Sequence, residues 1–337
     1  MAAGHGGDGG RRERAARRDA SLRSGRAALL TSLVVLAVSL AVLVWSVSGP
    51  GAALVQWGGG PSSAKATGGT ASPGSFAEDG HRGLPGGGAP SGGGTGRPTG
   101  EDALVDNPLY ATGRLAPLPC PAPDLDVTES ASMKALLDTV ADCLDHTWAT
   151  QFARAGIPYD PPQRVFWEVP GTSPCRDYPS SAGAFYCRAS KSIYIGTSDV
   201  VRKWNGVEDP AVYASLLAHE YSHHVQGESG LLDYYHEQRR NEADRSVQNS
   251  WTRKSELQAN CMAGAFLGAV RVSFPLGDAE RANVLDDAAA TADREGSSDD
   301  ERTHGSADNS VRWMDHGIAK QDPGVCNTWS AADDLVQ

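Results

Sequence analysis

The sequence contains no pair of cysteines in a C-x-x-C arrangement, and none of its first 119 residues is a cysteine. Without such a pair, a zinc site built from cysteines is not expected. Because no cysteine closely follows the apolar run 27–47, a lipid-modified N-terminus is not expected. No internal repeat is present, so the chain is not expected to be a repeat protein.

Charge is absent from residues 27–47, where Leu, Val and Ala dominate. This run of 21 residues matches the ~20 residues that a helix needs to cross a bilayer. Residues 1–26 carry seven arginines against three acids, which predicts a cytoplasmic N-terminus and an extracytoplasmic remainder at the plasma membrane. The alternative is a cleaved signal peptide and a secreted protein, with Ser46-Val47-Ser48 as a weak cleavage site.

Residues 48–103 have little apolar content with which to build a core. Between residues 51 and 100, 17 of 50 residues are glycine and five are proline, which predicts a disordered linker. Residues 104–337 remain, and they are sufficient for one domain with a single core. After residue 26 the chain has 23 basic and 38 acidic residues, and this negative balance argues against nucleic acid as a partner.

The apolar spacing within this domain predicts mostly helices, at 131–155, 210–226, 233–248, 252–272, 279–293 and 307–320. Extended runs at 164–169 and 192–195, the second soon after Tyr186-Cys187, predict a small sheet with a hairpin. The predicted fold class is therefore α+β and predominantly helical. An even number of cysteines in an exported domain predicts disulfides, and we expect the pairs Cys120–Cys143, Cys175–Cys187 and Cys261–Cys326, although spacing alone leaves the connectivity open.

The most informative motif is His219-Glu220-Tyr221-Ser222-His223, an H-E-x-x-H pentapeptide inside the predicted helix 210–226. Residues four apart on a helix share a face, so both imidazoles can bind one Zn²⁺ ion. Glu220 would then be placed to take a proton from zinc-bound water as a general base. The alternative is a pair of buried histidines bonded to the backbone, but two histidines and a glutamate together favour a metal.

A catalytic zinc needs a third protein ligand, and we expect it to be Glu256. The neighbouring Leu257, Ala259 and Cys261 are typical of a core, so a glutamate here is either drawn inward by a metal or is a surface charge. Asn260 lies one turn further along the same helix face and could accept a hydrogen bond from a liganding imidazole.

Several ordered blocks resemble a bacterial family of neutral zinc metallopeptidases over residues 107–330. The blocks are Asn107-Pro108-Leu109-Tyr110, Phe185-Tyr186-Cys187, Ser192-Ile193-Tyr194-Ile195, His219 to Gln226, Glu256 to Cys261, His304-Gly305-Ser306, Val311-Arg312-Trp313 and Cys326-Asn327-Thr328-Trp329. The resemblance implies a zincin-like peptidase with His219, His223 and Glu256 on zinc and Glu220 as the general base. Two positions depart from the family pattern: Asn260 replaces an expected Asp, which would make the adjacent imidazole less basic, and Gly196 replaces an expected acid.

The oxyanion formed during peptide hydrolysis needs a further donor beside the metal. His304 is our candidate, with Arg312 behind it, although His304 could equally be an ordinary loop histidine. Tyr194 could also serve or bind substrate, or simply fill the sheet, and the strand around residues 193–195 could pair with an extended substrate. His224 lies about 100° around the helix from His223, so we expect it behind the ligands or exposed.

The expected function is that of a membrane-anchored, extracytoplasmic zinc endopeptidase that acts on peptides or proteins and touches the bilayer through residues 27–47. One alternative is a non-catalytic zincin-like binding module at the cell surface, which the replacement at Asn260 favours. Another is a structural zinc protein, although such a site does not require a glutamate beside an open metal position.

Overall fold

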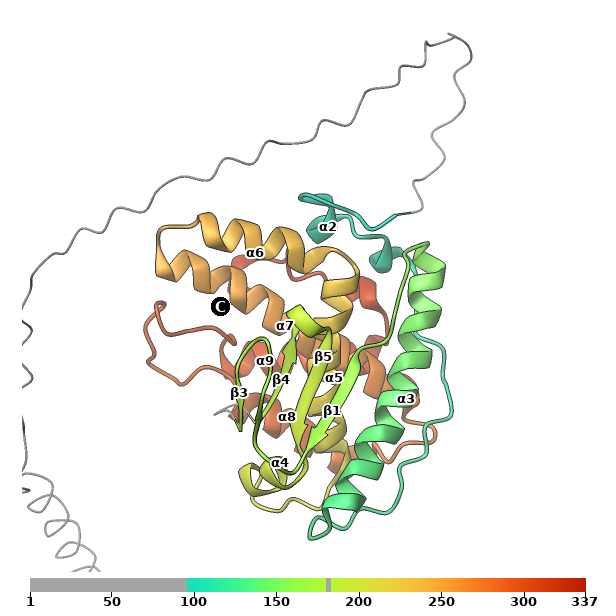
Figure 1. Cartoon of the computed structure of the whole chain (residues 1–337). Coiled ribbons are helices and arrows are strands. Elements are labelled where there is room, and N and C mark those ends of the chain that lie inside the picture. The colour runs from blue at the N-terminus through green and yellow to red at the C-terminus, as the bar shows by residue number, and fades with distance from the viewer. Residues whose placement is uncertain (1–95, 180–182) are drawn as a thin grey trace, which may run out of the picture. The chain divides into compact units, whose positions relative to one another are not determined.

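The computed structural model of the chain describes residues 96–179 and 183–337 (Figure 1). The predicted basic segment 1–26, the predicted span 27–47 and most of the predicted linker lie outside these residues. Among the helices that are described, none is both long and apolar enough to cross a membrane. Residues 96–103, at the end of the predicted linker, contact the domain: Ala103 is buried, and Arg97 forms an ion pair with Glu228 at 3.3 Å.

The described part of the chain has eight α-helices and a small sheet, so the expected α+β class is confirmed. The helices are α2 (Asp102–Val105), α3 (Ser130–Ala155), α4 (Thr197–Lys203), α5 (Pro210–Glu228), α6 (Leu231–Asn241), α7 (Arg245–Val270), α8 (Asp278–Ala290) and α9 (Ala307–Lys320). The strands are β1 (Gln163–Trp167), β2 (Gly171–Thr172), β3 (Asp177–Tyr178), β4 (Ala184–Cys187) and β5 (Ser192–Gly196).

Three predicted helices, 131–155, 210–226 and 307–320, are confirmed as α3, α5 and α9. The predictions 233–248 and 252–272 have the wrong boundary, because α6 ends at Asn241 and α7 already begins at Arg245. Asp244 causes this early start, since its carboxylate accepts the N–H of Ser246 and caps α7. The predicted helix 279–293 is observed as α8, which starts at Asp278 after its N-cap residue Gly277 and ends at Ala290.

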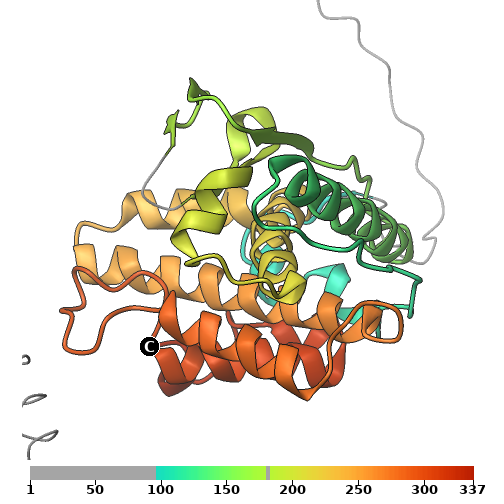
Figure 2. The ribbon, with the colours of Figure 1, turned by 90° about the horizontal axis from the view of Figure 1, so that it is seen from below.

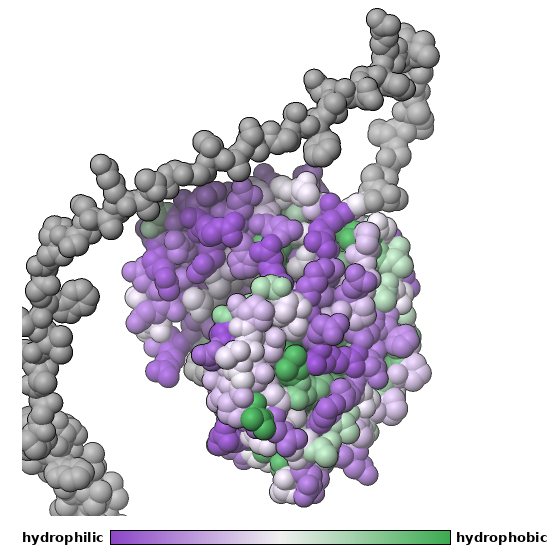
Figure 3. Space-filling view, in the orientation of Figure 1, coloured by the Kyte–Doolittle hydropathy of each residue, from purple (hydrophilic) through white to green (hydrophobic). Residues whose placement is uncertain are grey.

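The main sheet has the strand order β1-β5-β4, with β1 parallel and β4 antiparallel to β5. The hairpin expected around Tyr186-Cys187 is therefore confirmed. One face of this sheet packs against α5. On the other face Phe185 stacks on Tyr194, with the ring centroids 4.8 Å apart. Figure 3 shows small hydrophobic patches over the sheet, whereas hydrophilic side chains dominate the surface around α6.

Helices α7 and α9 run side by side beneath the sheet and α5, as Figure 2 shows. Glycines let their backbones meet: a Cβ at Gly264 would lie 2.2 Å from the carbonyl oxygen of Met314, and one at Gly317 would lie 2.0 Å from that of Cys261. The disulfide Cys261–Cys326 ties α7 to the chain that follows α9. The middle of α7 is thereby fixed within the core.

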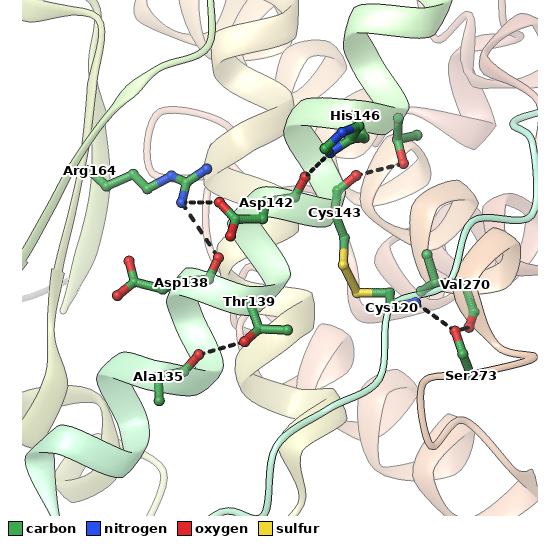
Figure 4. The surroundings of a disulfide bond; sticks show 11 residues. Cys120, Ala135, Asp138, Thr139, Asp142, Cys143, His146, Arg164, Val270 and Ser273 are labelled. Carbon is green, nitrogen blue, oxygen red and sulfur yellow. Dashed lines mark hydrogen bonds and ion pairs between the residues drawn. A yellow bond between two sulfur atoms is a disulfide. The ribbon is translucent and has the colours of Figure 1, made fainter.

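The three expected disulfides are those observed, Cys120–Cys143, Cys175–Cys187 and Cys261–Cys326. The first joins the segment before α3 to α3 itself, and Figure 4 shows its surroundings. The N–H of Cys120 donates to the Ser273 hydroxyl at 2.7 Å, and Arg164 of β1 pairs with Asp142 of α3 at 2.7 Å. The ion pair attaches α3 to the sheet, whereas the disulfide and the bond to Ser273 connect α3 to the segment that follows α7.

Candidate metal centre

Two elements far apart in the sequence supply three side chains that could together hold a metal ion. Helix α5 carries His219 and His223 on one face, and Glu256 comes from the fourth turn of α7. One Glu256 oxygen lies 3.2 Å from Nε2 of His219 and 3.4 Å from Nε2 of His223. All three ligand atoms lie within 4.8 Å of one another. Glu256 was expected at the start of its helix, but it lies well inside α7 because that helix begins earlier.

Amide oxygens hold both imidazoles by the nitrogen that faces away from Glu256. Nδ1 of His219 lies 2.8 Å from Oδ1 of Asn260, and Nδ1 of His223 lies 2.9 Å from Oε1 of Gln226. An amide oxygen only accepts hydrogen bonds, so each Nδ1 carries the proton. In the neutral form of each imidazole, Nε2 therefore presents its lone pair to the space shared with Glu256, which is the tautomer that a metal requires.

The sequence did not single out Gln226 for this role. Its side-chain NH₂ donates to the backbone oxygen of Ser255 at 2.9 Å and to Oε1 of Gln258 at 3.0 Å. These two bonds turn its oxygen toward His223, and all three residues are buried. The three-residue spacing from His223 to Gln226 on α5 was the only available signal, because Ser255 and Gln258 lie on another helix.

The site is a concentrated pair of opposite charges when no metal is bound. Burial lowers the pKa of the His223 imidazole, but the charge and hydrogen bond of Glu256 outweigh it and raise the pKa to about 9. Burial raises the pKa of Glu256, yet the neighbouring histidines hold it well below its usual range. A cation with two nitrogen ligands and one carboxylate is the natural replacement for the proton shared here.

These donors fit a zinc ion. Two imidazole nitrogens and one carboxylate oxygen are a ligand set of catalytic zinc sites, which leave a further position open. Each imidazole also has the outer partner that such sites need to fix ring orientation. His219, His223 and Glu256 would hold the ion, with Asn260 and Gln226 behind the histidines.

Glu220 lies beside this group and faces a cleft formed by two adjoining cavities of about 560 Å³ and about 340 Å³. Both cavities are lined by Ala184, His219, Glu220, Glu256 and His304. The metal-binding group is therefore at the junction of the two cavities. A substrate in the cleft would pass directly over it.

The structure brings His304 to this cleft from the loop before α9. The buried carboxylate of Asp293 holds that loop, because it accepts the backbone N–H groups of Thr303, His304 and Gly305 at 2.9, 3.0 and 2.8 Å. The imidazole itself is about half exposed. His304 is thus a fixed histidine at the mouth of the cleft, which the sequence left undecided.

Other expected site residues lie elsewhere. Arg312 is exposed and lines neither cavity, because α9 turns Trp313 and Met314 toward the core. Tyr194 is buried in the stack with Phe185 and fills the sheet. The prediction that the strand around residues 193–195 pairs with a substrate is wrong, because β5 is the central strand and pairs with β1 on one side and β4 on the other.

One of the two expectations for His224 was an exposed side chain, and this expectation is wrong. Its ring is buried, with Nε2 lying 2.8 Å from the Asp160 carbonyl oxygen and Nδ1 lying 3.2 Å from the Tyr186 hydroxyl. Burial lowers its pKa. It helps to join α5 to the sheet and takes no part in the metal-binding group.

Comparison with known proteins places the chain in a family. A family model described as "Putative neutral zinc metallopeptidase" matches residues 123–329. The chain belongs to this family. It is similar to Uncharacterized protein YpfJ of Escherichia coli K12, with 28% identity over 55% of this chain and 67% of that protein. It is also similar to Uncharacterized protein Rv2575 of Mycobacterium tuberculosis H37Rv, with 32% identity over 51% of this chain and 64% of that protein. No solved structure matches significantly.

Proposed function

We propose that the chain is a zinc-dependent endopeptidase with a zincin-like site, which hydrolyses peptide bonds with Glu220 as the general base. The observation that best supports this is the convergence of His219, His223 and Glu256 within 4.8 Å, beside a glutamate that faces an open cleft. Membership of the neutral zinc metallopeptidase family agrees with it.

A zinc ion held by these three residues supplies Lewis acidity, which makes water more acidic and polarises a carbonyl. Glu220 accepts a proton from the attacking water while the oxygen of that water forms a bond to the carbonyl carbon of the peptide. Glu220 then gives that proton to the amine nitrogen as the carbon–nitrogen bond breaks. His304, held over the cleft by Asp293, is our candidate for stabilising the oxyanion, in place of Arg312 or Tyr194.

The edge strand β4 provides a surface on which the substrate backbone can pair. Gly196 N–H donates to the carbonyl oxygen of Gly183, and hydrogen-bonded positions alternate in an antiparallel pair. The backbone groups of Ala184 and Tyr186 therefore point away from β5, and both residues line the cleft. An extended peptide could add to this edge as a further strand.

We further propose that residues 27–47 anchor the chain in the plasma membrane, with the metal-binding domain outside the cytoplasm. Three observations support an extracytoplasmic domain: the uncharged run, the arginines before it and the three disulfides. Release of the domain by signal cleavage remains the competing proposal. Protease accessibility of the domain in intact cells, together with the N-terminal sequence of the mature protein, separates these two proposals.

A second candidate function is a non-catalytic module that binds a partner through the same cleft. Asn260 favours it, because an amide raises the basicity of His219 less than a carboxylate would. The decisive experiment compares zinc-loaded wild type with Glu220→Gln on an unfolded protein substrate. Peptidase action predicts that the variant keeps zinc and loses ~10²–10⁴-fold in rate. Cleavage that survives the substitution would reject the mechanism, whereas zinc without any cleavage by the wild type would favour the binding module.

A further inference from the structure

The smaller cavity of the cleft extends from the metal-binding group along β4 and is lined by cationic residues. Its volume is about 340 Å³. Apart from the three candidate metal ligands, Glu220 and His304, its titratable lining consists of two arginines, a histidine and two tyrosines: Arg176, Arg188, His236, Tyr186 and Tyr235. Among the described residues, the acids that line it are Glu220 and Glu256, the proposed general base and the candidate third metal ligand. The larger cavity differs, because it has both Lys203 and Asp287 in its wall.

Arg176 is held at the open edge of β4. The disulfide Cys175–Cys187 ties its loop to the end of that strand. Its guanidinium lies over the ring of Phe185, 4.9 Å from the centroid. Arg176 is exposed and forms no ion pair with any residue in the described ranges 96–179 and 183–337. A positioned and unneutralised guanidinium therefore borders the path of the substrate.

The surroundings of His236 are consistent with a positive local potential. Burial lowers its pKa, and the charges of Arg188, Arg239 and Arg240 lower it further, to about 4. Arg188 itself is paired with Asp233, so it contributes less net charge than Arg176. This region is thus cationic, although the chain as a whole has a net charge of −11.

We propose that Arg176, Arg188 and His236 form a subsite that binds a carboxylate of the substrate, which we call the basic subsite. This inference rests on the proposed peptidase function and adds a substrate preference to it. A guanidinium offers a planar pair of donors that matches a carboxylate, and such charge-assisted bonds are about twice as strong as neutral ones. The contact with the Phe185 ring positions the Arg176 guanidinium, whose N–H groups are the donors for the ligand.

The carboxylate could come from an acidic side chain or from the C-terminus of the peptide. Strand β4 runs from Ala184, beside the metal-binding group, toward Cys187 and the basic subsite. A peptide antiparallel to β4 puts residues N-terminal to the cleaved bond on the subsite. A parallel peptide puts C-terminal residues, or the terminal carboxylate, there instead.

The test measures binding to the full-length Glu220→Gln protein loaded with zinc, so that turnover does not interfere. The probes are fluorescein-labelled octapeptides of Ala and Leu that carry one Glu or one Gln on either side of the central bond, each with a free or an amidated C-terminus. Fluorescence anisotropy gives their affinities. The expected result is that one carboxylate-bearing probe binds ~10-fold or more tightly than its neutral counterpart.

Two further substitutions in the same protein assign the preference. Arg176→Gln should remove most of it, whereas the exposed Arg271→Gln, ~22 Å further along α7 from Glu256, should retain it. Equal affinities for all probes, no binding of any probe, or a preference unchanged by Arg176→Gln would overturn the basic subsite. If preferred probes bind but the wild type does not cleave them, the peptidase function fails while the subsite stands. If the wild type cleaves without preference, only the subsite fails.

Discussion

The hydrogen bond from His219 to Asn260 gives a sharp test of how the site is held. Oδ1 of Asn260 is 2.8 Å from Nδ1 of His219 and fixes the tautomer that leaves Nε2 free. In Asn260→Ala this acceptor is lost, so the ring can rotate or move its proton to Nε2. Each of these changes must be reversed before a metal binds.

Loss of such an outer partner typically costs 10–100-fold in metal affinity, which is about 1.4–2.7 kcal/mol. We therefore expect Asn260→Ala to bind zinc ~10–100-fold more weakly than the wild type. Asn260→Asp is the matched control: it keeps an acceptor at the same position and adds charge, so its affinity should equal or exceed that of the wild type.

The assay is competition for zinc against a chromophoric chelator at pH 7.5, with thermal unfolding of the metal-free proteins to show that the variants fold alike. Wild-type affinity in Asn260→Ala would refute the claim that this residue orients His219. Equal losses in the Ala and Asp variants would refute it too, because they would point to a packing effect.

Four further predictions follow from the charges, the packing and the disulfides. Because Glu256 raises the pKa of His223 to about 9, zinc must displace a proton from this imidazole at neutral pH. The affinity for zinc should therefore rise about tenfold per pH unit from pH 7 to about 9. Titration calorimetry in several buffers should detect the release of this proton. The same shift makes the metal-free domain lose stability as pH rises from ~6.5 to 9, as urea unfolding would detect. Gly264→Ala should destabilise the domain by about 1–3 kcal/mol or more in urea, because its Cβ would meet the Met314 carbonyl; unchanged stability would contradict the close α7–α9 packing. Replacing both cysteines of Cys261–Cys326 by serine should cost about 4 kcal/mol, against about 3 for Cys175–Cys187, because the loops span 65 and 12 residues; the reverse order would contradict the entropic reasoning.

Local signals were enough to predict α5, the helix that carries His219 and His223. Asp209 and Pro210 mark its start, and the Asp209 carboxylate does accept the N–H of Ala211. The four-residue spacing from His219 to His223 then determines which face both histidines share. Glu256 could be proposed because Leu257, Ala259 and Cys261, which follow it, are typical of a core, a pattern that does not depend on the rest of the fold.

The features that depend on distant contacts could not be predicted. Gln226 acquires its role only through Ser255 and Gln258 of α7, and nothing near it in the sequence shows this. The choice of β5 as a substrate edge was wrong because strand order depends on which strands pair, whereas β4 and β5 look alike as short apolar runs. Asp244 was a local signal that the prediction missed. It lies inside the predicted helix 233–248, but it is the N-cap residue of α7.

The most direct test of the central claim is the zinc content of the purified chain, measured by elemental analysis after dialysis against a weak chelator. The wild type should retain one zinc ion per chain, and Glu256→Ala should retain almost none while its metal-free form unfolds at a temperature close to that of the metal-free wild type. Equal zinc in both proteins would contradict the assignment of Glu256 as the third ligand.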